Sequence, residues 1–170
     1  GYQLLTVSAL RWRMLDAKYE PHRGRWGLAI SDAAREAIRQ HLRGGGALLA
    51  MHTATICFDD WPEWGDIVGA RWVWGQSGHA PFGGVDVQFD AAPAGSIGAG
   101  LAAFDCEDEV YESMWMAPDV QPLAHARNQT TATGQPGAWT PVLWTRQWQG
   151  GRVVYDALGH NARSLDHPVH

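Results

Sequence analysis

The sequence predicts a single α/β domain built around a mainly parallel β-sheet. Two observations lead to this prediction: apolar residues recur at helical spacing between residues 32 and 43, and an almost continuous apolar run follows directly at residues 47–51. An apolar strand that follows a helix this closely is typical of a sheet covered on both faces, and such sheets are parallel. The sequence has no internal repeat, low-complexity tract or linker, so residues 1–170 are expected to form one domain.

The first part of the chain predicts two strands and one helix. Tyr2–Val7 is apolar and bounded by polar residues, as a short buried strand would be, whereas Ala9–Ile30 has no clean period and is predicted to be a long surface loop. Ser31 is a typical N-cap for a helix over Asp32–Arg43, which three glycines end. The strand Ala47–Met51 comes next.

The remainder predicts a short helix and a series of strands. The helix begins at Pro62 and ends at Gly69, and Asp59 and Asp60 stand where they could cap it. Asn128–Trp139 is rich in Thr, Gly and Pro and is predicted to be a flexible loop. The expected strands are Gly84–Phe89, Asp105–Tyr111, Val120–Ala124, Pro141–Arg146 and Arg152–Leu158.

Composition excludes several classes of protein. The formal net charge of −5 argues against a surface for nucleic acid or for an anionic membrane. No apolar stretch approaches the ~18 residues of a membrane-spanning helix. Cys57 and Cys106 show no metal-binding or framework spacing, so we interpret them as free thiols in a reducing compartment and expect a cytoplasmic protein. The sequence begins without Met, and a signal peptide before Gly1 stays an open alternative.

Two histidines follow predicted strands at the point where each strand ends. His52 comes directly after Ala47–Met51, and His160 follows Arg152–Leu158 through Gly159, which permits a tight turn. Open α/β sheets bind ligands at the carboxyl ends of their strands, so both imidazoles are expected at one rim of the sheet. Imidazole serves there as a general acid or base, or as a metal ligand. Hydrogen-bonded anchoring of the loops is an equally strong interpretation.

Other polar residues have simpler explanations when the sequence is taken alone. His79 lies in a glycine-rich loop, whose backbone freedom could account for the segment. Asp108 and Glu109 belong to an acidic patch that we interpret as a solvated edge strand. The ten tryptophans, Trp61 among them, suit core or rim packing, although aromatic faces also stack on sugar rings.

Four segments, taken together and in order, resemble the ThuA-like family, named for trehalose utilisation. They read GGGALLAMHTAT, DDWPEWGDIVGARWVWGQSGH, EDEVYE and PVLWTRQWQGGRVVYDALGHNARSLDHP. The resemblance implies a class I glutamine amidotransferase-like fold, a flavodoxin-like three-layer sandwich. In true glutaminases of that superfamily this strand ends in a Gly-x-Cys nucleophile elbow. Here His52 stands where the cysteine would be, so a glutaminase is not expected.

The resemblance also implies a set of site residues. His52, Glu109 and His160 are the expected catalytic residues, and His79, Tyr111, Asp108 and Gly159 are expected at the substrate, where we add Trp61 as an aromatic contact. His52, His79 and His160 together with a carboxylate could hold Zn²⁺ or Mn²⁺, which would polarise a carbonyl. The histidines are far apart in the sequence, so spacing alone establishes no metal.

The chain departs from the family pattern at three places. Compared with the family, the first strand–helix unit and the closing C-terminal helix are expected to be absent, so the sheet is expected to be incomplete at its N-terminal side. The usual HPI before the acidic strand is replaced by Gly95–Ile97. An exposed sheet edge would favour pairing, and a homo-oligomer is therefore a second expectation.

The resemblance predicts an enzyme of carbohydrate catabolism. We expect an isomerase, lyase or hydrolase that acts on a 3-keto disaccharide or glycoside, with a small sugar as its partner. Two alternatives stay open: a non-catalytic carbohydrate-binding or accessory module, and a glutaminase-like hydrolase that uses Cys57.

Overall fold

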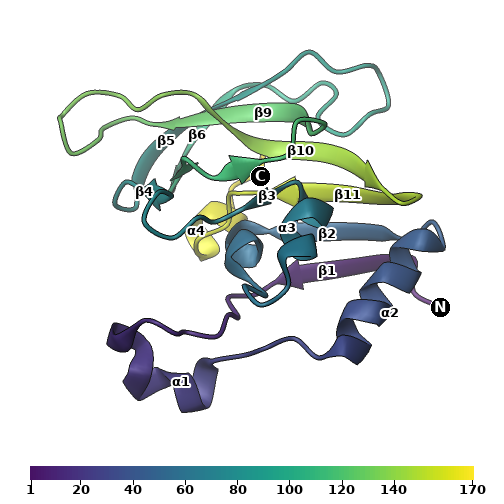
Figure 1. The fold of residues 1–170 in the computed structure, drawn as a ribbon. Helices are drawn as coiled ribbons and strands as arrows, with labels where there is room; N and C mark the ends of the chain where they lie inside the picture. The colour runs from purple at the N-terminus through teal and green to yellow at the C-terminus, as the bar shows by residue number, and fades with distance from the viewer.

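A seven-stranded β-sheet organises the chain, which the computed structural model describes over all residues from 1 to 170 (Figure 1). The strands of this sheet lie in the order β1-β2-β11-β10-β9-β5-β6. Their bounds are β1 Leu4–Ser8, β2 Ala47–Met51, β5 Gly83–Phe89, β6 Phe104–Asp108, β9 Gln121–Asn128, β10 Thr140–Trp148 and β11 Gly151–Asp156. The fold is mixed α/β, consistent with the expected flavodoxin-like class.

Only one part of the sheet is parallel, so the expectation of a mainly parallel sheet was partly wrong. β2 pairs in parallel with β1 and with β11, whereas β10, β9, β5 and β6 join by antiparallel pairing. The reason is the short connections: β10 and β11 are joined through Gln149 and Gly150 alone, both at positive φ. A two-residue turn of this kind forms a hairpin, which can only be antiparallel.

Helices α2 Asp32–Arg43 and α3 Pro62–Val68 pack on one face of the parallel strands. Both were predicted, and Ser31 caps α2 as expected, since its hydroxyl accepts from the amide of Ala34 at 3.2 Å. Gly69 ends α3 with φ +89, a conformation that glycine adopts without steric cost. The apolar residues beneath these helices form one core, which includes Leu42, Leu48, Trp64, Ile67, Trp144, Val153 and Tyr155.

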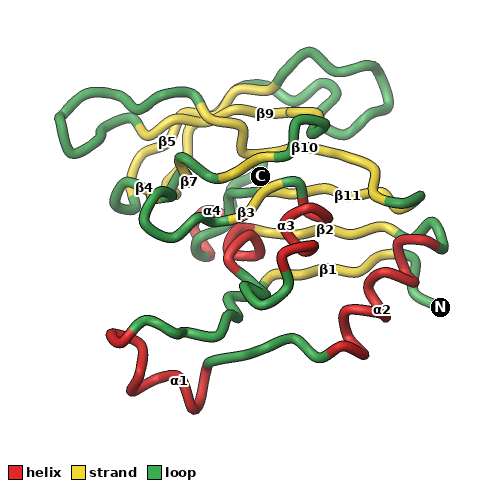
Figure 2. The backbone as a smooth tube through the Cα atoms, in the orientation of Figure 1, coloured by secondary structure: helices red, strands yellow, loops and turns green.

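The segment predicted as a loop over residues 9–30 contains helical structure (Figure 2). It holds the 3-10 helix η1 Ala17–Tyr19 and the helix α1 Glu20–Trp26, which has its proline in the first turn, where proline is tolerated. α1 buries no residue, and this is why its sequence shows no amphipathic period. None of the helices is both long and apolar enough to cross a membrane.

Short elements differ from the prediction at two further places. The predicted strand over residues 105–111 is divided into β6 and the two-residue strand β7 Tyr111–Glu112. Asp59 and Asp60 do not cap α3; they pair with Arg13 and Arg35. The other short elements are η2 His52–Ile56, β3 Ala70–Arg71, β4 Gly78–His79, β8 Trp115–Met116 and α4 Ala162–Leu165.

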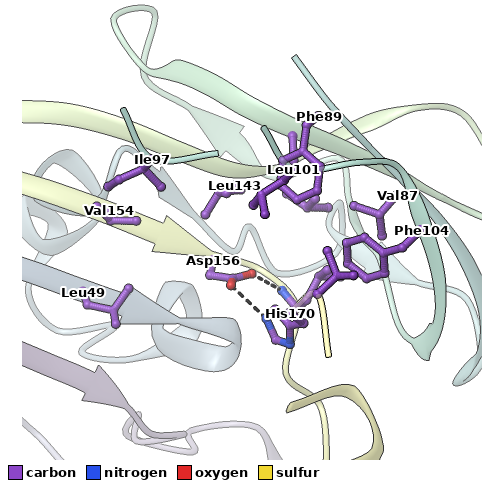
Figure 3. Close-up of a pocket in the computed structure, with 14 residues that line it drawn as sticks. Leu49, Val87, Phe89, Ile97, Leu101, Phe104, Leu143, Val154, Asp156 and His170 are labelled. Atoms are coloured by element: carbon purple, nitrogen blue, oxygen red, sulfur yellow. Dashed lines mark hydrogen bonds and ion pairs between the residues drawn. The ribbon is translucent and has the colours of Figure 1, made fainter. Parts of the chain in front are cut away.

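The opposite face of the sheet carries an apolar pocket of about 230 Å³ (Figure 3). Leu49, Val154 and Phe104 are among its apolar walls, and an ion pair between Asp156 and His170 lies at one side of it (Figure 3). The two side chains are joined at 2.9 Å from Oδ2 of Asp156 to Nε2 of His170 and are largely buried. This hydrogen bond to Asp156, against the opposing effect of burial, raises the pKa of His170 to about 9.

This ion pair makes stability depend on pH. Because the folded pKa of His170 lies above its unfolded value of about 6.5, its contribution is complete below pH 6.5 and is lost as pH rises through about 9. The shift corresponds to a loss of about 3 kcal/mol at most between these limits. The pKa of the nearby Cys106 thiol is raised to about 12 by burial and by acidic neighbours, among them Asp108 and Asp156, so this thiol adds a further loss of stability above about pH 8.5, where it ionises in the unfolded chain.

Urea unfolding at intervals from pH 6 to 10 would measure the effect. His170→Gln keeps a polar side chain and removes the titrating group, so its free energy of unfolding should fall less steeply over the window than that of the parent. Equal slopes for the parent and the variant would show that the pair does not contribute.

Candidate functional site

The two strand-end histidines meet at one rim of the sheet, as predicted. β2 and β11 are adjacent and parallel, so their carboxyl ends lie side by side. His52 follows β2 directly, and His160 follows β11 after a turn at Gly159, whose φ of +107 requires glycine. The centroids of the two imidazole rings are 5.5 Å apart and the rings meet edge to face.

A buried carboxylate joins these histidines to a third. Glu109 Oε1 lies 2.9 Å from Nδ1 of His160 and 3.4 Å from Nε2 of His52, and Glu109 Oε2 lies 3.0 Å from Nδ1 of His79. The side chain of Glu109 is only 7% exposed, whereas His79 and His160 are each 40% exposed. The cluster therefore has a buried carboxylate and two imidazoles that reach solvent.

The interpretation of the acidic patch as solvated was wrong for two of its members. β6 is an edge strand, as expected, and Glu107 is exposed on it. Asp108 and Glu109 are instead buried, because β6 ends there and the turn after β11 covers them. Their charges are met by amide N–H groups and imidazoles, and this satisfies the polar atoms that burial removes from water.

Asp108 positions the residues around it. Its carboxylate accepts from the amide of Gly159 at 2.8 Å, of His160 at 3.3 Å and of Glu109 at 2.8 Å. It also accepts a short hydrogen bond from the hydroxyl of Ser164. All four donors belong to the protein itself, and Asp108 is fully buried. The carboxylate of Asp108 therefore holds the backbone of Glu109 and His160 in place.

His52 adopts a backbone conformation that non-glycine residues rarely take. Its φ is +44, directly after a strand and at the start of η2. Tyr155 donates its hydroxyl to the carbonyl of His52 at 2.7 Å, and Nδ1 of His52 donates to the carbonyl of Ala157 at 2.7 Å. Such strained positions are typical of functional sites, and this strand–turn–helix is the position at which the superfamily's nucleophile elbow was expected.

The pKa values of the cluster are shifted by its own members. Burial alone would lower the pKa of His52, but the bonds to Glu109 and to the carbonyl of Ala157 raise it above its usual value. Burial alone would raise the pKa of Glu109, but His52, His79 and His160 lower it. Burial, with nearby acidic groups, raises the pKa of Tyr111, whose hydroxyl lies 3.0 Å from Nε2 of His52.

An aromatic pocket adjoins the cluster. The β4–β7 pairing sets His79 beside Tyr111, and the ring of Trp72 packs against both, at 6.2 Å and 5.2 Å between centroids. Trp72 also lines a pocket of about 390 Å³. Trp61 and Trp74 line the same pocket; Trp61 is buried, whereas Trp74 is 51% exposed.

The structure brings together most of the residues that were expected at the site. His52, His79, Glu109, Tyr111 and His160 form the cluster. Asp108 and Gly159 lie behind it as supports, and Trp61 lies apart from it in the wall of the aromatic pocket, where its indole donates to Glu63. Sequence reasoning missed three contributors: Tyr155, Ser164 and Trp72. All three lie within segments of the family resemblance, but nothing in those segments distinguishes them from the residues of the core.

Cys57 does not have the properties of a nucleophile. Both cysteines are free thiols, as expected. The thiol of Cys57 is buried, donates to the carbonyl of Ala9 at 3.0 Å and accepts from the amide of Arg11. Burial raises its pKa, so the reactive thiolate is disfavoured. This argues against the alternative of a glutaminase-like hydrolase.

Three donor atoms of the cluster fit the requirements of a metal ion. Nitrogens of His52 and His160 and a carboxylate oxygen of Glu109 all lie within 4.8 Å of one another. His79, which we also expected as a ligand, is outside this set. Its Nδ1 lies 2.9 Å from the carbonyl oxygen of Ala80, which can only accept a hydrogen bond, so Nδ1 donates there.

Solved structures of similar fold include ThuA-like proteins and β-galactosidases. A ThuA-like protein from Parabacteroides merdae has a TM-score of 0.72 and 16% identity over 96% of this chain, which spans only 62% of that protein. One from Bacteroides uniformis has a TM-score of 0.62 and 18% identity, with coverage of 89% of this chain and 68% of that one. A cold-adapted β-galactosidase from a Rahnella species has a TM-score of 0.55 and 12% identity, with coverage of 92% and 20%.

At these identities the solved structures establish the fold alone. No curated protein matches the sequence significantly. The profile of the ThuA family, described as trehalose utilisation, matches residues 24–170, which is most of the chain. The chain therefore belongs to the ThuA family, and this membership supports a carbohydrate-related role.

Proposed function

We propose that this protein is an enzyme that acts on an oxidised (keto) disaccharide or glycoside, as an isomerase, lyase or hydrolase, by proton transfer at the Glu109 cluster. One observation carries the proposal: a buried carboxylate contacts three imidazoles where two parallel strands end. Ligands bind at this edge in open α/β sheets. Family membership supports the carbohydrate part of the proposal.

The chemistry of a keto sugar suits the groups present. A carbonyl at C3 acidifies the neighbouring C–H bond, so isomerisation or elimination needs a base, an acid and stabilisation of the enolate. His52 and His160 are proposed as the acid–base pair or as ligands of a cation, and Glu109 as a second base or a carboxylate ligand. The hydroxyl of Tyr111 stays neutral, because its pKa is raised, and can orient a sugar hydroxyl.

The aromatic pocket supports a carbohydrate ligand independently of the catalytic groups. Its volume of about 390 Å³ is sufficient for a sugar ring, and Trp74, which lines it, is 51% exposed. Trp72 lines this pocket, and its ring also packs against Tyr111 and His79. A disaccharide could therefore place one ring at the cluster and the other against the tryptophans.

Proton exchange provides a test that requires no knowledge of the final product. In D₂O the parent should replace the hydrogen next to the carbonyl of a 3-keto glycoside, followed by NMR, and should leave the unoxidised glycoside unchanged. Glu109→Gln should slow exchange by about 10²–10⁴-fold, because the buried base is lost. Glu107→Gln, two residues away on the exposed side, should exchange at the parental rate. No exchange above buffer, or equal rates in both variants, would refute the proposal.

The aromatic pocket also favours a second candidate, a non-catalytic carbohydrate-binding module. In that case calorimetry should show that Glu109→Gln binds the glycoside as the parent does, with no exchange in either protein. Trp74→Ala should weaken binding about 3- to 10-fold, since it removes one stacking face. Binding that survives both substitutions would exclude this pocket as the sugar site.

A further inference from the structure

Three donor atoms at the strand ends are already arranged nearly as a bound ion would require. Glu109 Oε1 lies 3.4 Å from Nε2 of His52 and 2.9 Å from Nδ1 of His160. Nitrogen and carboxylate ligands bind zinc at about 2.0–2.2 Å, so two ligands of a tetrahedral ion are about 3.3 Å apart. Two of the three separations thus match, and all three atoms lie within 4.8 Å of one another.

The tautomer of His52 presents its second nitrogen to this site. Nδ1 lies 2.7 Å from the carbonyl of Ala157, which can only accept, so Nδ1 carries a proton. In the neutral ring Nε2 then has an unprotonated lone pair, which accepts from the hydroxyl of Tyr111 at 3.0 Å and could bind a metal ion instead. A backbone carbonyl on the far nitrogen is the usual support of a metal-binding histidine.

Asp108 provides the corresponding support for the other two donors. It accepts from the amides of Glu109 and His160 and so fixes the backbone from which both side chains extend. It makes no ion pair with Arg or Lys, and Glu109 pairs with histidines alone. The charge of Glu109 is therefore balanced by imidazoles alone, a role that a divalent cation held between them could share.

Exposure leaves one side of the donor set open. His52 and Glu109 are 8% and 7% exposed, whereas His160 is 40% exposed. Three protein ligands with an open position are typical of catalytic metal sites, and structural zinc sites by contrast use four.

From these contacts we propose that His52, Glu109 and His160 bind one divalent transition-metal ion, Zn²⁺ or Mn²⁺, through Nε2, a carboxylate oxygen and Nδ1. Two imidazoles and one carboxylate suit ions of this class. The inference concerns the same site as the proposed function and rests on it for its chemical meaning: the ion would polarise the carbonyl of the keto sugar. An ion on Nε2 of His52 would displace the hydroxyl of Tyr111, which is thereby freed to contact the sugar.

Metal binding can be measured without any sugar. The full chain would be stripped with a chelator, dialysed and titrated with Zn²⁺, with elemental analysis for stoichiometry, and with Co²⁺, whose visible spectrum reports coordination. The parent should bind one ion per chain. His160→Ala should weaken binding by about 100-fold or more, because loss of even an outer-shell partner costs 10- to 100-fold.

His22→Ala is the matched control, since His22 is an exposed histidine on α1 and lies outside the donor set. It should bind the ion as the parent does. His22 and His160 are both exposed, so neither substitution is expected to unfold the chain, and near-ultraviolet circular dichroism would verify this. A parent that binds no stoichiometric ion, or equal losses in the two variants, would overturn the inference.

The outcomes separate this inference from the proposed function. Deuterium exchange on a keto glycoside by a protein that binds no metal would overturn the metal site and leave proton transfer by the histidines intact. One bound ion that is lost in His160→Ala, with no exchange on any keto glycoside, would uphold the metal site and refute the proposed reaction.

Discussion

Asp108→Ala should lower the free energy of unfolding by about 3–5 kcal/mol, because it removes a buried acceptor that four donors share. Each buried donor left without a partner costs about 1–3 kcal/mol, and part of this returns as the turn relaxes. The carboxylate is fully buried and accepts from the amides of Glu109, Gly159 and His160 and from the hydroxyl of Ser164. One of these donors has a second acceptor: the amide of Gly159 also donates to the hydroxyl of Ser164, at 3.1 Å.

Chemical denaturation with urea would measure this loss, and Asp105→Ala is the matched control. Asp105 lies on the same strand, β6, three residues earlier, and is exposed. Its substitution should change the free energy of unfolding by no more than about 0.5 kcal/mol. If Asp105→Ala and Asp108→Ala were equally destabilising, the role of Asp108 as the support of the turn would be wrong.

Local sequence patterns predicted the elements whose stability is local. The helix over residues 32–43 was predicted with both ends correct, because its cap, its apolar stripe and its terminal glycines all lie within the segment itself. The strand ending at Met51 was predicted for the same reason. α1 was missed because it buries none of its residues and so leaves no apolar period in the sequence.

The pairing of strands was harder to predict, because direction depends on partners far away in the chain. An apolar run has the same sequence pattern in a parallel and in an antiparallel pair of strands. The antiparallel direction of β10 relative to β11 is visible in the sequence only through the turn at Gln149 and Gly150. That turn was the one local feature that could have corrected the prediction.

The sequence predicted which residues belong to the candidate site, but not which of them are in contact. The strand-end rule placed His52 and His160 together, and family resemblance added Glu109, which the residues alone suggested to be solvated. Burial of Glu109 depends on the turn that contains Gly159, about fifty residues later, and no spacing in the sequence encodes this. The same holds for Tyr155, whose apolar strand gives no indication that its hydroxyl supports His52.

Trp144→Ala should lower the free energy of unfolding by about 3–5 kcal/mol, as expected for removal of a large aromatic side chain from a packed core. Trp144 is fully buried and its indole donates to the carbonyl of Val68 at 2.9 Å. The centroid of its ring lies 4.4 Å from the centroid of the Tyr155 ring. Trp144→Phe retains an aromatic ring but loses the hydrogen bond, so an intermediate loss of about 1–3 kcal/mol is expected.

Because Tyr155 donates to the carbonyl of His52, the cavity left by Trp144→Ala borders the support of the site as well as the core. Urea unfolding would measure stability, and Trp139→Ala, which removes a tryptophan that is 40% exposed, should leave it within about 0.5 kcal/mol of the parent. A loss in Trp144→Ala no greater than in Trp139→Ala would mean that this part of the sheet is not the stabilising core, and that His52 is held by its own hydrogen bonds alone.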